Sequence, residues 1–459
     1  MNNTLKWLLT SSLLGGSIAA AHAAGPAIDP NTLQLTVDGQ PYFIRGMNYA
    51  PETRGWPGNG LTSVGPQGQQ HKNGAWLCSG TNEYSPGDWQ SACGDNDLAG
   101  KLTDTTVNNK AYNAALTQVW DRDLGDMQRL GVNTIRLYDV QASQFKKHTD
   151  FLNEASQHGI RVIFPALTTY TNSHPDTLPG TVTALVNETC PSGALHPAIL
   201  AYNVGNELPL SDAQTVANIH TAISIVRREC PGALVSYTDN DDISGGSNSW
   251  IINPQGISPA LELLGNSKHT KGKGVDVFMV NEYRNDGNGG LSAYDTLFQQ
   301  IQALTTAYQI PFAIGETGQY DNQQFSPNWY NNEWAYLLKH SQNVHNLGAL
   351  YFEYNDEPIK KDIARDPTDN GHQQFMGIVT ADWPKGRSEE EYIDVPTIHK
   401  GGSYAGIPSF SDSNGVIISF PYSNQNNSST GRYSMFSDGT VCNYQTGPSP
   451  SPTSGPCTH

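Results

Sequence analysis

Short apolar runs alternate with longer amphipathic stretches through most of the chain. The runs are apolar at nearly every position, which is typical of parallel strands buried on both faces. We predict strands at Tyr42–Asn48, Val132–Val140, Ile160–Leu167, Ala198–Glu207, Ala233–Thr238, Val275–Tyr283, Pro311–Glu316 and Ala349–Tyr354. Helical periodicity between them predicts helices at Ala111–Leu130, Ser143–His158, Thr181–Thr189, Asp212–Arg228, Tyr294–Tyr308 and Trp329–Val344.

Eight strands that alternate with helices favour an α/β fold, a closed parallel (β/α)8 TIM barrel. An open doubly wound sheet is the competing fold, but no glycine-rich phosphate loop follows the first strand. Before the barrel, Leu33–Tyr49 has the pattern of a hairpin that turns at Asp38-Gly39 and leads into the first strand.

Two regions lack sustained periodicity. Pro51 to Lys110 follows the first strand and is rich in Gly, Asn and Gln with several aromatic residues, so we expect a long loop on the face where parallel strands end. After about Pro396 the composition shifts towards Asn, Ser, Gly and Pro. We therefore divide the chain into residues 1–23, a barrel domain at 24–400, and a small C-terminal extension at 401–459 that is either a β unit or a linker.

The first residues have the pattern of a secretory signal peptide. Lys6 precedes the apolar stretch Trp7–Ala20, and Ala21-His22-Ala23 resembles a cleavage site. The stretch is too short and too rich in Ser and Gly for a membrane span. We expect residues 1–23 to be removed and the protein to be secreted, either extracellular or periplasmic, with no membrane span.

Charge and cysteine content narrow the partners. The net charge is −17 and becomes −18 when Lys6 is removed, which argues against nucleic acid or anionic membranes and allows a neutral polymer. We expect a monomer. Six cysteines in an exported chain suggest disulfides, with local pairs Cys78–Cys93, Cys190–Cys230 and Cys442–Cys457 the simplest of the possible pairings. No cysteine and histidine spacing suggests zinc, and we expect no metal or cofactor.

Two of the predicted strands end in a glutamate. The fourth is AILAYNVGNE and ends at Glu207, and the seventh is IPFAIGE and ends at Glu316. In a parallel barrel these ends meet at one face, where active sites lie. Two carboxylates across a cleft are the equipment for cleaving a glycosidic bond. We expect Glu207 to protonate the leaving oxygen, with a raised pKa, and an ionised Glu316 to attack the anomeric carbon.

Neighbouring strand ends supply supporting groups. The Asn206 amide is placed to hold a sugar hydroxyl, and Arg136 to keep Glu316 ionised, with Arg45 as the weaker candidate and an ion pair to Asp139 as the purely structural role. Tyr283 is placed to donate a hydrogen bond to Glu316, and a ring of the last strand is expected to line the floor of the site. The substrate-binding candidates are Asn206, Arg136, Tyr283, Tyr138, Asp139 and Tyr354.

Several motifs resemble glycoside hydrolase clan A, and within it the β-1,3-glucan enzymes of families 17 and 72. FIRGMNYAP, LGVNTIRLYDV, ILAYNVGNE, VDVFMVNEY, IPFAIGETG and YFEYNDEPIKKD carry the resemblance over roughly residues 42–380. It implies that Glu207 is the acid/base and Glu316 the nucleophile, with Asn206, Arg136 and Tyr283 in support. The chain departs from family 17 at Gln319-Tyr320, where that family usually has Trp-Pro, and the insertion at 51–110 is typical of neither family.

The expected function is a retaining β-glycosidase acting on β-1,3-glucan through a covalent glycosyl-enzyme. A glucanosyltransferase, in which a second sugar replaces water, is the close variant of this hypothesis. Two further hypotheses are a clan A enzyme for β-1,4-glucan or mannan, and a barrel that binds glycans without catalysis. Retention requires the two carboxyl groups to lie about 5–5.5 Å apart.

Overall fold

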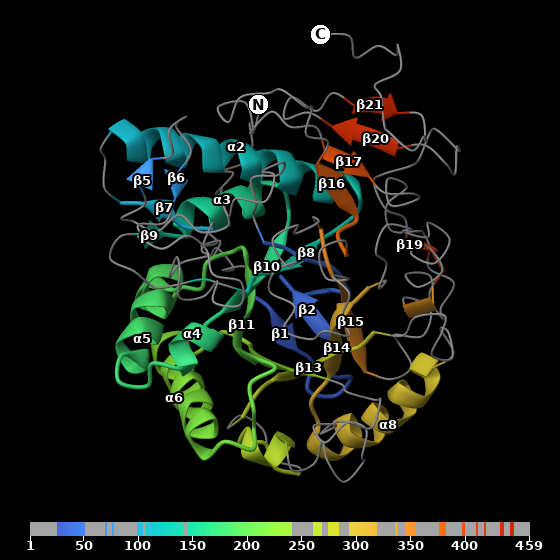
Figure 1. The fold of residues 1–459 in the computed structure, drawn as a ribbon. Coiled ribbons are helices and arrows are strands. Elements are labelled where there is room, and N and C mark those ends of the chain that lie inside the picture. Colours follow the sequence, from blue (N-terminus) through green and yellow to red (C-terminus); the bar gives the residue numbers. More distant parts are fainter. Residues whose placement is uncertain are drawn as a thin grey trace, which may run out of the picture.

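The computed structural model describes most of the barrel and parts of the segments around it (Figure 1). The described residues are 25–50, 99–103, 107–138, 140, 146–240, 260–268, 274–283, 293–318, 336–337, 345–354 and 376–381, with the backbone of short strands at 69–70, 76–77, 397–399, 410–411, 417–418, 432–435 and 441–444.

Eight parallel strands close into a barrel, as the sequence pattern predicts (Figure 1). In chain order they are β4 (Ile44–Asn48), β8 (Thr134–Arg136), β10 (Arg161–Pro165), β11 (Ile199–Asn206), β12 (Val235–Asn240), β13 (Val277–Asn281), β14 (Phe312–Thr317) and β15 (Asn346–Tyr351). Each pairs in parallel with the next along the chain, and β15 pairs with β4 to close the ring. Since every strand points the same way, all their carboxyl ends lie at one face.

The strands are apolar on both faces because the barrel has two hydrophobic layers. One layer fills the barrel interior with side chains such as Ile163, Leu200 and Met279, and includes Leu35 and Val37 of the N-terminal hairpin. The other layer, much larger, lies between the strands and the surrounding helices. The hairpin therefore packs against the interior layer, and the opposite end of the barrel carries the loops after the strands.

The N-terminal hairpin forms as predicted. Strands β2 (Leu35–Val37) and β3 (Gln40–Pro41) pair antiparallel, and β1 (Ala27–Ile28) adds to β2. The turn residues Asp38 and Gly39 have φ of 54° and 77°, the left-handed conformation that an Asp-Gly turn between two strands adopts.

Helices cover the outside of the barrel between the strands. They are α2 (Val107–Arg129), α3 (Thr149–Gln157), the short α4 (Thr169–Asn172), α5 (Leu178–Thr189), the 3-10 turn η1 (Pro191–Gly193), α6 (Ala213–Glu229) and α8 (Ala293–Tyr308). Asp212 caps α6 by accepting from the backbone N–H groups of Gln214 and Thr215. In the part that the structure describes, no helix combines the length and apolar character needed to cross a bilayer.

One predicted helix begins later than expected, and another is described only in part. The helix predicted at Ser143–His158 begins only at Thr149, because β9 (Lys146–Lys147) pairs with the distant β7 (Lys101–Leu102). A pairing partner some 45 residues away is invisible to local periodicity, so the predicted start was wrong. Of the helix predicted at Trp329–Val344, the structure describes 336–337, which are helical.

One disulfide joins two neighbouring helices. Cys190 and Cys230 follow α5 and α6 and are bonded, as predicted, across a separation of 40 residues. Closing a loop of this length stabilises the fold by about 4 kcal/mol in the chain-entropy description. The side chains of the other two predicted pairs, Cys78–Cys93 and Cys442–Cys457, lie outside the described residues.

The structure describes little of the predicted loop and extension. Within Pro51–Lys110, β5 (Gln69–Gln70) pairs with β6 (Trp76–Leu77). Near the C-terminus, β16 (Val379–Ala381), β17 (Thr397–His399), β20 (Arg432–Met435) and β21 (Val441–Tyr444) form one antiparallel sheet, and β18 (Phe410–Ser411) pairs with β19 (Ile417–Ile418). Strands on either side of the predicted boundary at residue 400 thus pair with one another. Residues 1–24 lie outside the described residues.

Candidate active site

Four barrel strands deliver polar side chains to the same face. Arg136 ends β8, Asn281 ends β13, and Asn206 ends β11 with Glu207 directly after it. Glu316 is the fifth residue of β14, level with Asn281 in the strand register. Because the strands belong to one parallel barrel, these residues meet above its interior layer.

Glu316 is held by three donors. Its Oε1 accepts hydrogen bonds from Arg136 Nη1 at 3.2 Å and from the Tyr138 hydroxyl at 2.8 Å, and its Oε2 accepts from the Tyr283 hydroxyl at 2.7 Å. Burial, followed by the Glu316 charge, raises the pKa of Tyr138 well above its usual range. The Tyr138 hydroxyl therefore stays protonated and acts as the hydrogen-bond donor to Glu316. One cation and two hydroxyl groups thus donate to the two oxygens of this carboxylate.

Arg136 connects the two halves of the site. It is fully buried, and besides Glu316 it donates to the carbonyl of Gly315 at 3.2 Å and to Asn206 Oδ1. Its guanidinium also lies over the Tyr138 ring at 4.7 Å. Arg45, the weaker candidate, lies elsewhere, because its Nε donates to the carbonyl of Gly131, just before the second barrel strand begins.

Glu207 differs from Glu316 in its surroundings. Glu207 is exposed when its solvent exposure is taken over the whole residue. Its carboxylate accepts a 2.6 Å hydrogen bond from Asn281 Nδ2. Although the residue as a whole reaches solvent, the carboxyl group lies low among the strand ends. Its withdrawal from water, followed by the nearby charge of Glu316, outweighs the Asn281 hydrogen bond and raises the pKa of Glu207 to about 7.

The backbone at Glu207 is also unusual. Its φ is 51°, in the left-handed region that a residue other than glycine adopts infrequently. The Glu207 N–H donates to the carbonyl of Thr238 on β12 at 3.0 Å, which holds the conformation in place. A conformation of this kind at a strand end is typical of positions where the direction of a side chain matters more than local stability.

Two amides link the carboxylates. Asn206 Oδ1 accepts from Arg136 and from Asn281 Nδ2, the latter at 3.2 Å, so its NH2 group is directed away from both. Asn281 donates to Glu207 and lies 3.5 Å from Arg136 Nη1, bridging the two sides. A Cβ at Gly315 would come within 2.8 Å of Asn281 Oδ1, so this approach requires glycine there. The sequence pattern singles out Asn281 within the VNEY motif but does not place it among the site residues.

The aromatic ring beside Glu316 is Phe352. Its ring makes edge contacts with Tyr138 at 6.1 Å and with Tyr283 at 6.3 Å, the two tyrosines that donate to Glu316. In the sequence Phe352 is only one of three aromatic residues of the last predicted strand. The alternation of the predicted strand does not distinguish it from Tyr354, because residues two positions apart in a strand point to the same face.

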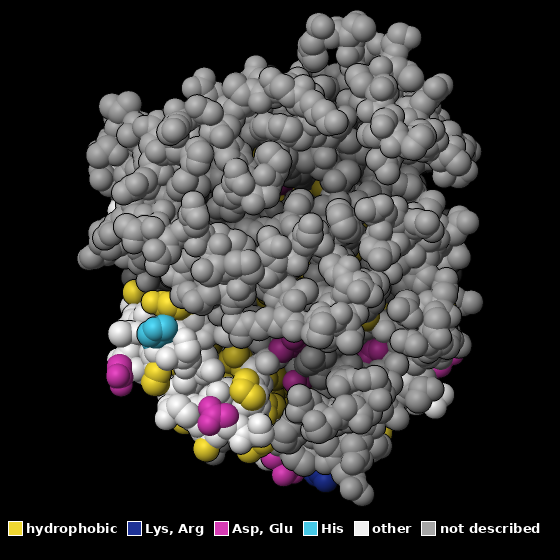
Figure 2. All heavy atoms as spheres, in the orientation of Figure 1, with side chains coloured by type: hydrophobic (Ala, Val, Ile, Leu, Met, Phe, Trp, Pro, Cys, Tyr) yellow, Lys and Arg dark blue, Asp and Glu magenta, His cyan; other side chains and the backbone are white. Residues whose placement is uncertain are grey.

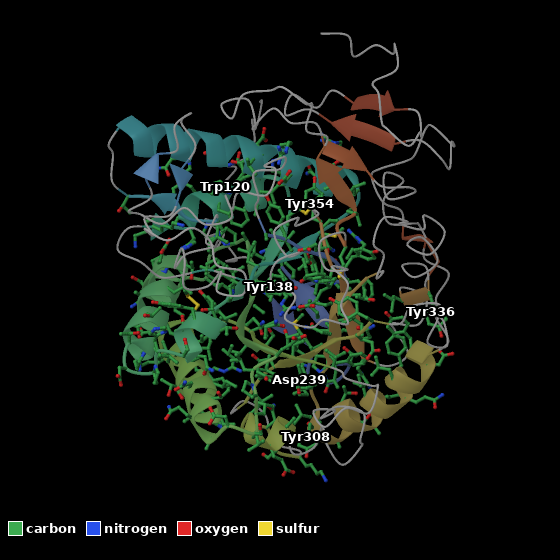
Figure 3. All side chains as sticks on the ribbon, viewed as in Figure 1. Trp120, Tyr138, Asp239, Tyr308, Tyr336 and Tyr354 are labelled. Carbon is green, nitrogen blue, oxygen red and sulfur yellow. A yellow bond between two sulfur atoms is a disulfide. The ribbon has the colours of Figure 1, made fainter. Side chains whose placement is uncertain are left out.

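Tyr354 does not line the site. It is fully buried, and its hydroxyl donates to Asp126 of α2 at 2.7 Å (Figure 3). It belongs to a buried group between α2 and the ends of β4 and β15, which we term the helix α2 cluster: Tyr49, Arg122, Asp123, Asp126 and Tyr354. The choice of Tyr354 as a substrate contact was therefore wrong. Asp139, the remaining candidate, lies outside the described residues.

One group of side chains has metal-ligand spacing among the described residues, and it lies on the α2 and α3 side, away from these strand ends. There, Asp121 and Glu154 each approach His158 Nε2 at 3.4 Å. The strand-end site itself offers two carboxyl groups in unlike environments: Glu316 accepts three hydrogen bonds, whereas the pKa of Glu207 is raised to about 7. That pair can supply a charged nucleophile and a proton donor in one step.

Comparisons with known proteins leave the chain without an assigned family. No family model matches it, and no curated protein matches it. Among solved structures, it resembles ScGas2 in complex with compound 8, with 16% identity, 78% of this chain and 64% of that chain covered, and a TM-score of 0.47. It also resembles a β-glucuronidase of Bacteroides uniformis, with 14% identity, 82% and 38% covered, and a TM-score of 0.46. The chain covers less than two thirds of either structure, and neither likeness adds to the barrel established by strand pairing.

Proposed function

We propose that this protein is a retaining β-glycosidase that cleaves or rearranges β-1,3-glucan. The observation that carries the proposal is the contrast between the two strand-end carboxylates. Glu316 receives three hydrogen bonds that favour its charge, whereas burial and the Glu316 charge raise the pKa of Glu207 to about 7. Pairs of titratable groups whose environments separate their pKa values are typical of acid and nucleophile assignments.

The first half of the reaction breaks the glycosidic bond. Glu207 gives its proton to the leaving oxygen while a Glu316 oxygen attacks the anomeric carbon from the other side, forming a glycosyl ester and a free sugar hydroxyl. The negative charge of Glu316 is consumed as the ester forms. In this proposal the Asn206 NH2 group, which is turned away from Arg136 and Asn281, holds the 2-hydroxyl of the sugar.

The second half releases the sugar. Glu207, now ionised, takes a proton from a water molecule whose oxygen attacks the anomeric carbon and displaces Glu316. If a sugar hydroxyl replaces water, the same step makes a new glycosidic bond, and the enzyme acts as a transferase. Two inversions give net retention, for which the carboxyl groups should lie about 5–5.5 Å apart.

The substrate class rests on the sequence motifs that resemble the β-1,3-glucan enzymes, and the acidic chain is compatible with a neutral glycan. β-1,4-Glucan and mannan are the competing substrates. Export is supported by the Cys190–Cys230 disulfide, since such bonds persist in oxidising compartments. Assays of reducing ends and product length on laminarin, cellulose and mannan separate the substrates.

Azide rescue tests the two roles. Azide needs no general base, so it should restore turnover of Glu207→Ala on an activated aryl β-glucoside and give the β-glycosyl azide. Glu316→Ala should instead give the α-azide, and Glu316→Gln should form no covalent intermediate by mass spectrometry. As a control, Glu229→Ala on α6 removes a carboxylate remote from the strand ends and should keep full activity. Exchanged stereochemistry would reverse the roles, and full activity of both variants would place the site elsewhere.

A further inference from the structure

An exposed tyrosine lies on a short helix that follows the third barrel strand. Tyr170 belongs to α4 (Thr169–Asn172), a few residues after β10 ends at Pro165. Its side chain is 43% exposed, and among the described residues the only other exposed large hydrophobic side chain is Leu263, at 36%. Tyr170 is therefore the exposed aromatic residue of the described surface, on the face that carries the strand ends.

The Tyr170 ring is held in place by its neighbours. The His174 ring lies against it, with centroids 4.2 Å apart and planes 30° apart. The Ser173 hydroxyl donates to the Tyr170 carbonyl at 2.7 Å, and His174 Nδ1 lies 2.8 Å from the same carbonyl. Thr168 caps the helix by accepting from the Thr171 N–H. A surface ring that is ordered beforehand loses little conformational entropy when a ligand binds to it.

Helix α4 stands on the Glu207 side of the barrel. The Asn172 side chain donates to Thr215, and Asn218 donates to the Asn172 carbonyl, at 3.2 and 3.0 Å. Thr215 and Asn218 are in the first turns of α6, whose cap comes five residues after Glu207. Figure 1 shows α4 beside α5 and α6, and Figure 2 shows hydrophobic and histidine side chains at the surface over this region.

The position of α4 matters because Glu207 is the general acid of the proposed reaction. A general acid touches the oxygen of the leaving group, so the leaving half of the glycan lies on the side of Glu207. A sugar ring has an apolar C–H face that packs on the face of an aromatic ring. A lone exposed tyrosine is common on protein surfaces, but this one is ordered, is paired with a second ring, and lies on a helix that packs against the first turns of α6, the helix that follows Glu207.

We infer that Tyr170 and His174 form a platform that binds a sugar unit of the leaving-group half of the glycan, a few units away from the bond that is cleaved. The inference rests on the proposed function and adds a binding site outside the residues that carry the chemistry. The same platform would bind the acceptor sugar if the enzyme transfers glycosyl groups, since the acceptor occupies the place that the leaving group vacates.

Chain length is the variable that tests the platform. Tyr170→Ala should raise KM for laminari-oligosaccharides long enough to reach the platform by about 3- to 10-fold, the effect of losing one aromatic contact. It should leave kcat/KM unchanged for an aryl β-glucoside, which has no sugar in the leaving half. Tyr170→Phe should behave like the unchanged protein, His174→Ala should give a smaller rise in KM, and the matched control Leu263→Ala should give none.

Binding to an inactive variant separates this inference from the proposed function. In the Glu316→Gln background, titration calorimetry with laminarihexaose should show the same weakening, about 3- to 10-fold, for Tyr170→Ala. Unchanged affinity and unchanged product lengths would overturn the platform while leaving the glycosidase proposal intact. An equal loss on the aryl glucoside would overturn it too, since the effect would then lie in the catalytic residues. If the active protein cleaves no glycan but binds laminarihexaose through Tyr170, the proposed reaction fails and the platform stands.

Discussion

The strand-end site and the helix α2 cluster are built from the same kinds of groups. In the site, Arg136, Tyr138 and Tyr283 surround Glu316 at 2.7 to 3.2 Å. In the helix α2 cluster, Asp123 accepts from Arg122 and Tyr49 at 2.8 and 3.0 Å, and Asp126 accepts from Tyr354 at 2.7 Å. An arginine, carboxylates and two tyrosine hydroxyls are therefore common to both regions.

What separates the regions is the neighbour of the stabilised carboxylate. Asp123 and Asp126 are at most 1% exposed and lie between a helix and two strand ends. Glu316, 7% exposed, faces the carboxyl group of Glu207, an otherwise exposed residue, and burial of that group helps to raise its pKa to about 7. A carboxylate with several donors is thus not itself a sign of catalysis. The sign is a second carboxyl group close by whose pKa is raised towards neutrality.

The largest expected difference between the regions concerns their arginines. Arg136→Lys keeps the charge but loses the fork that reaches both Glu316 and Asn206, so kcat on laminarin should fall by about 10²- to 10³-fold. Arg122→Lys should leave kcat within about twofold and lower the unfolding free energy by about 1–3 kcal/mol, since it disturbs a buried pair without touching the site. Steady-state kinetics and urea unfolding of both variants check this. Similar losses of kcat would remove the distinction between the two regions.

The second difference is a pH dependence that only the site should have. With a pKa of about 7, Glu207 is protonated and active as an acid below that pH, so kcat/KM should fall about tenfold per pH unit above it. The folded pKa lies above the unfolded value of about 4.3, so the native state binds more protons between these pH values. The unfolding free energy that this group contributes therefore decreases as the pH rises from about 4.3 to 7.

Glu207→Gln tests both parts of that prediction. The variant should lose the alkaline fall in kcat/KM on an activated aryl β-glucoside and should have a smaller loss of stability between about pH 5 and 8 than the unchanged protein. The measurements are pH–rate profiles and urea unfolding at each pH. An alkaline fall that persists in the variant would assign the titration to another group.

The smallest expected difference concerns two tyrosines. Tyr283→Phe removes a hydrogen bond to a charged carboxylate, so kcat should fall roughly 10-fold with little change in stability. Tyr354→Phe should have the opposite profile: kcat unchanged and the unfolding free energy lower by about 1–3 kcal/mol, because a buried carboxylate of α2 loses a donor. Thermal unfolding and kinetics on one oligosaccharide suffice. A loss of kcat in Tyr354→Phe without destabilisation would return that residue to the site.

The sequence by itself determined the barrel and the position of its two glutamates. Strands buried on both faces must be apolar throughout, so all eight could be recognised locally, and the ends of parallel strands must share a face. For the same reason Glu207 and Glu316 could be predicted to meet, and Arg136 and Tyr283 with them, before any contact was known. The start of α3 could not be predicted from the sequence, because it depends on the pairing of Lys146–Lys147 with the distant strand Lys101–Leu102.

Only the tertiary structure decided what each polar or aromatic side chain at the strand ends contacts. Phe352 and Tyr354 lie two residues apart beyond β15, yet one packs against the tyrosines around Glu316 and the other bonds to Asp126 of α2. Asn281 became a bridge because a glycine on the next strand allows its approach, and Glu207 acquired its raised pKa from burial and from a charge 109 positions away in the chain. Periodicity assigns a residue to an element and a face, whereas hydrogen bonds and pKa values depend on atoms that only the folded chain brings within a few ångströms.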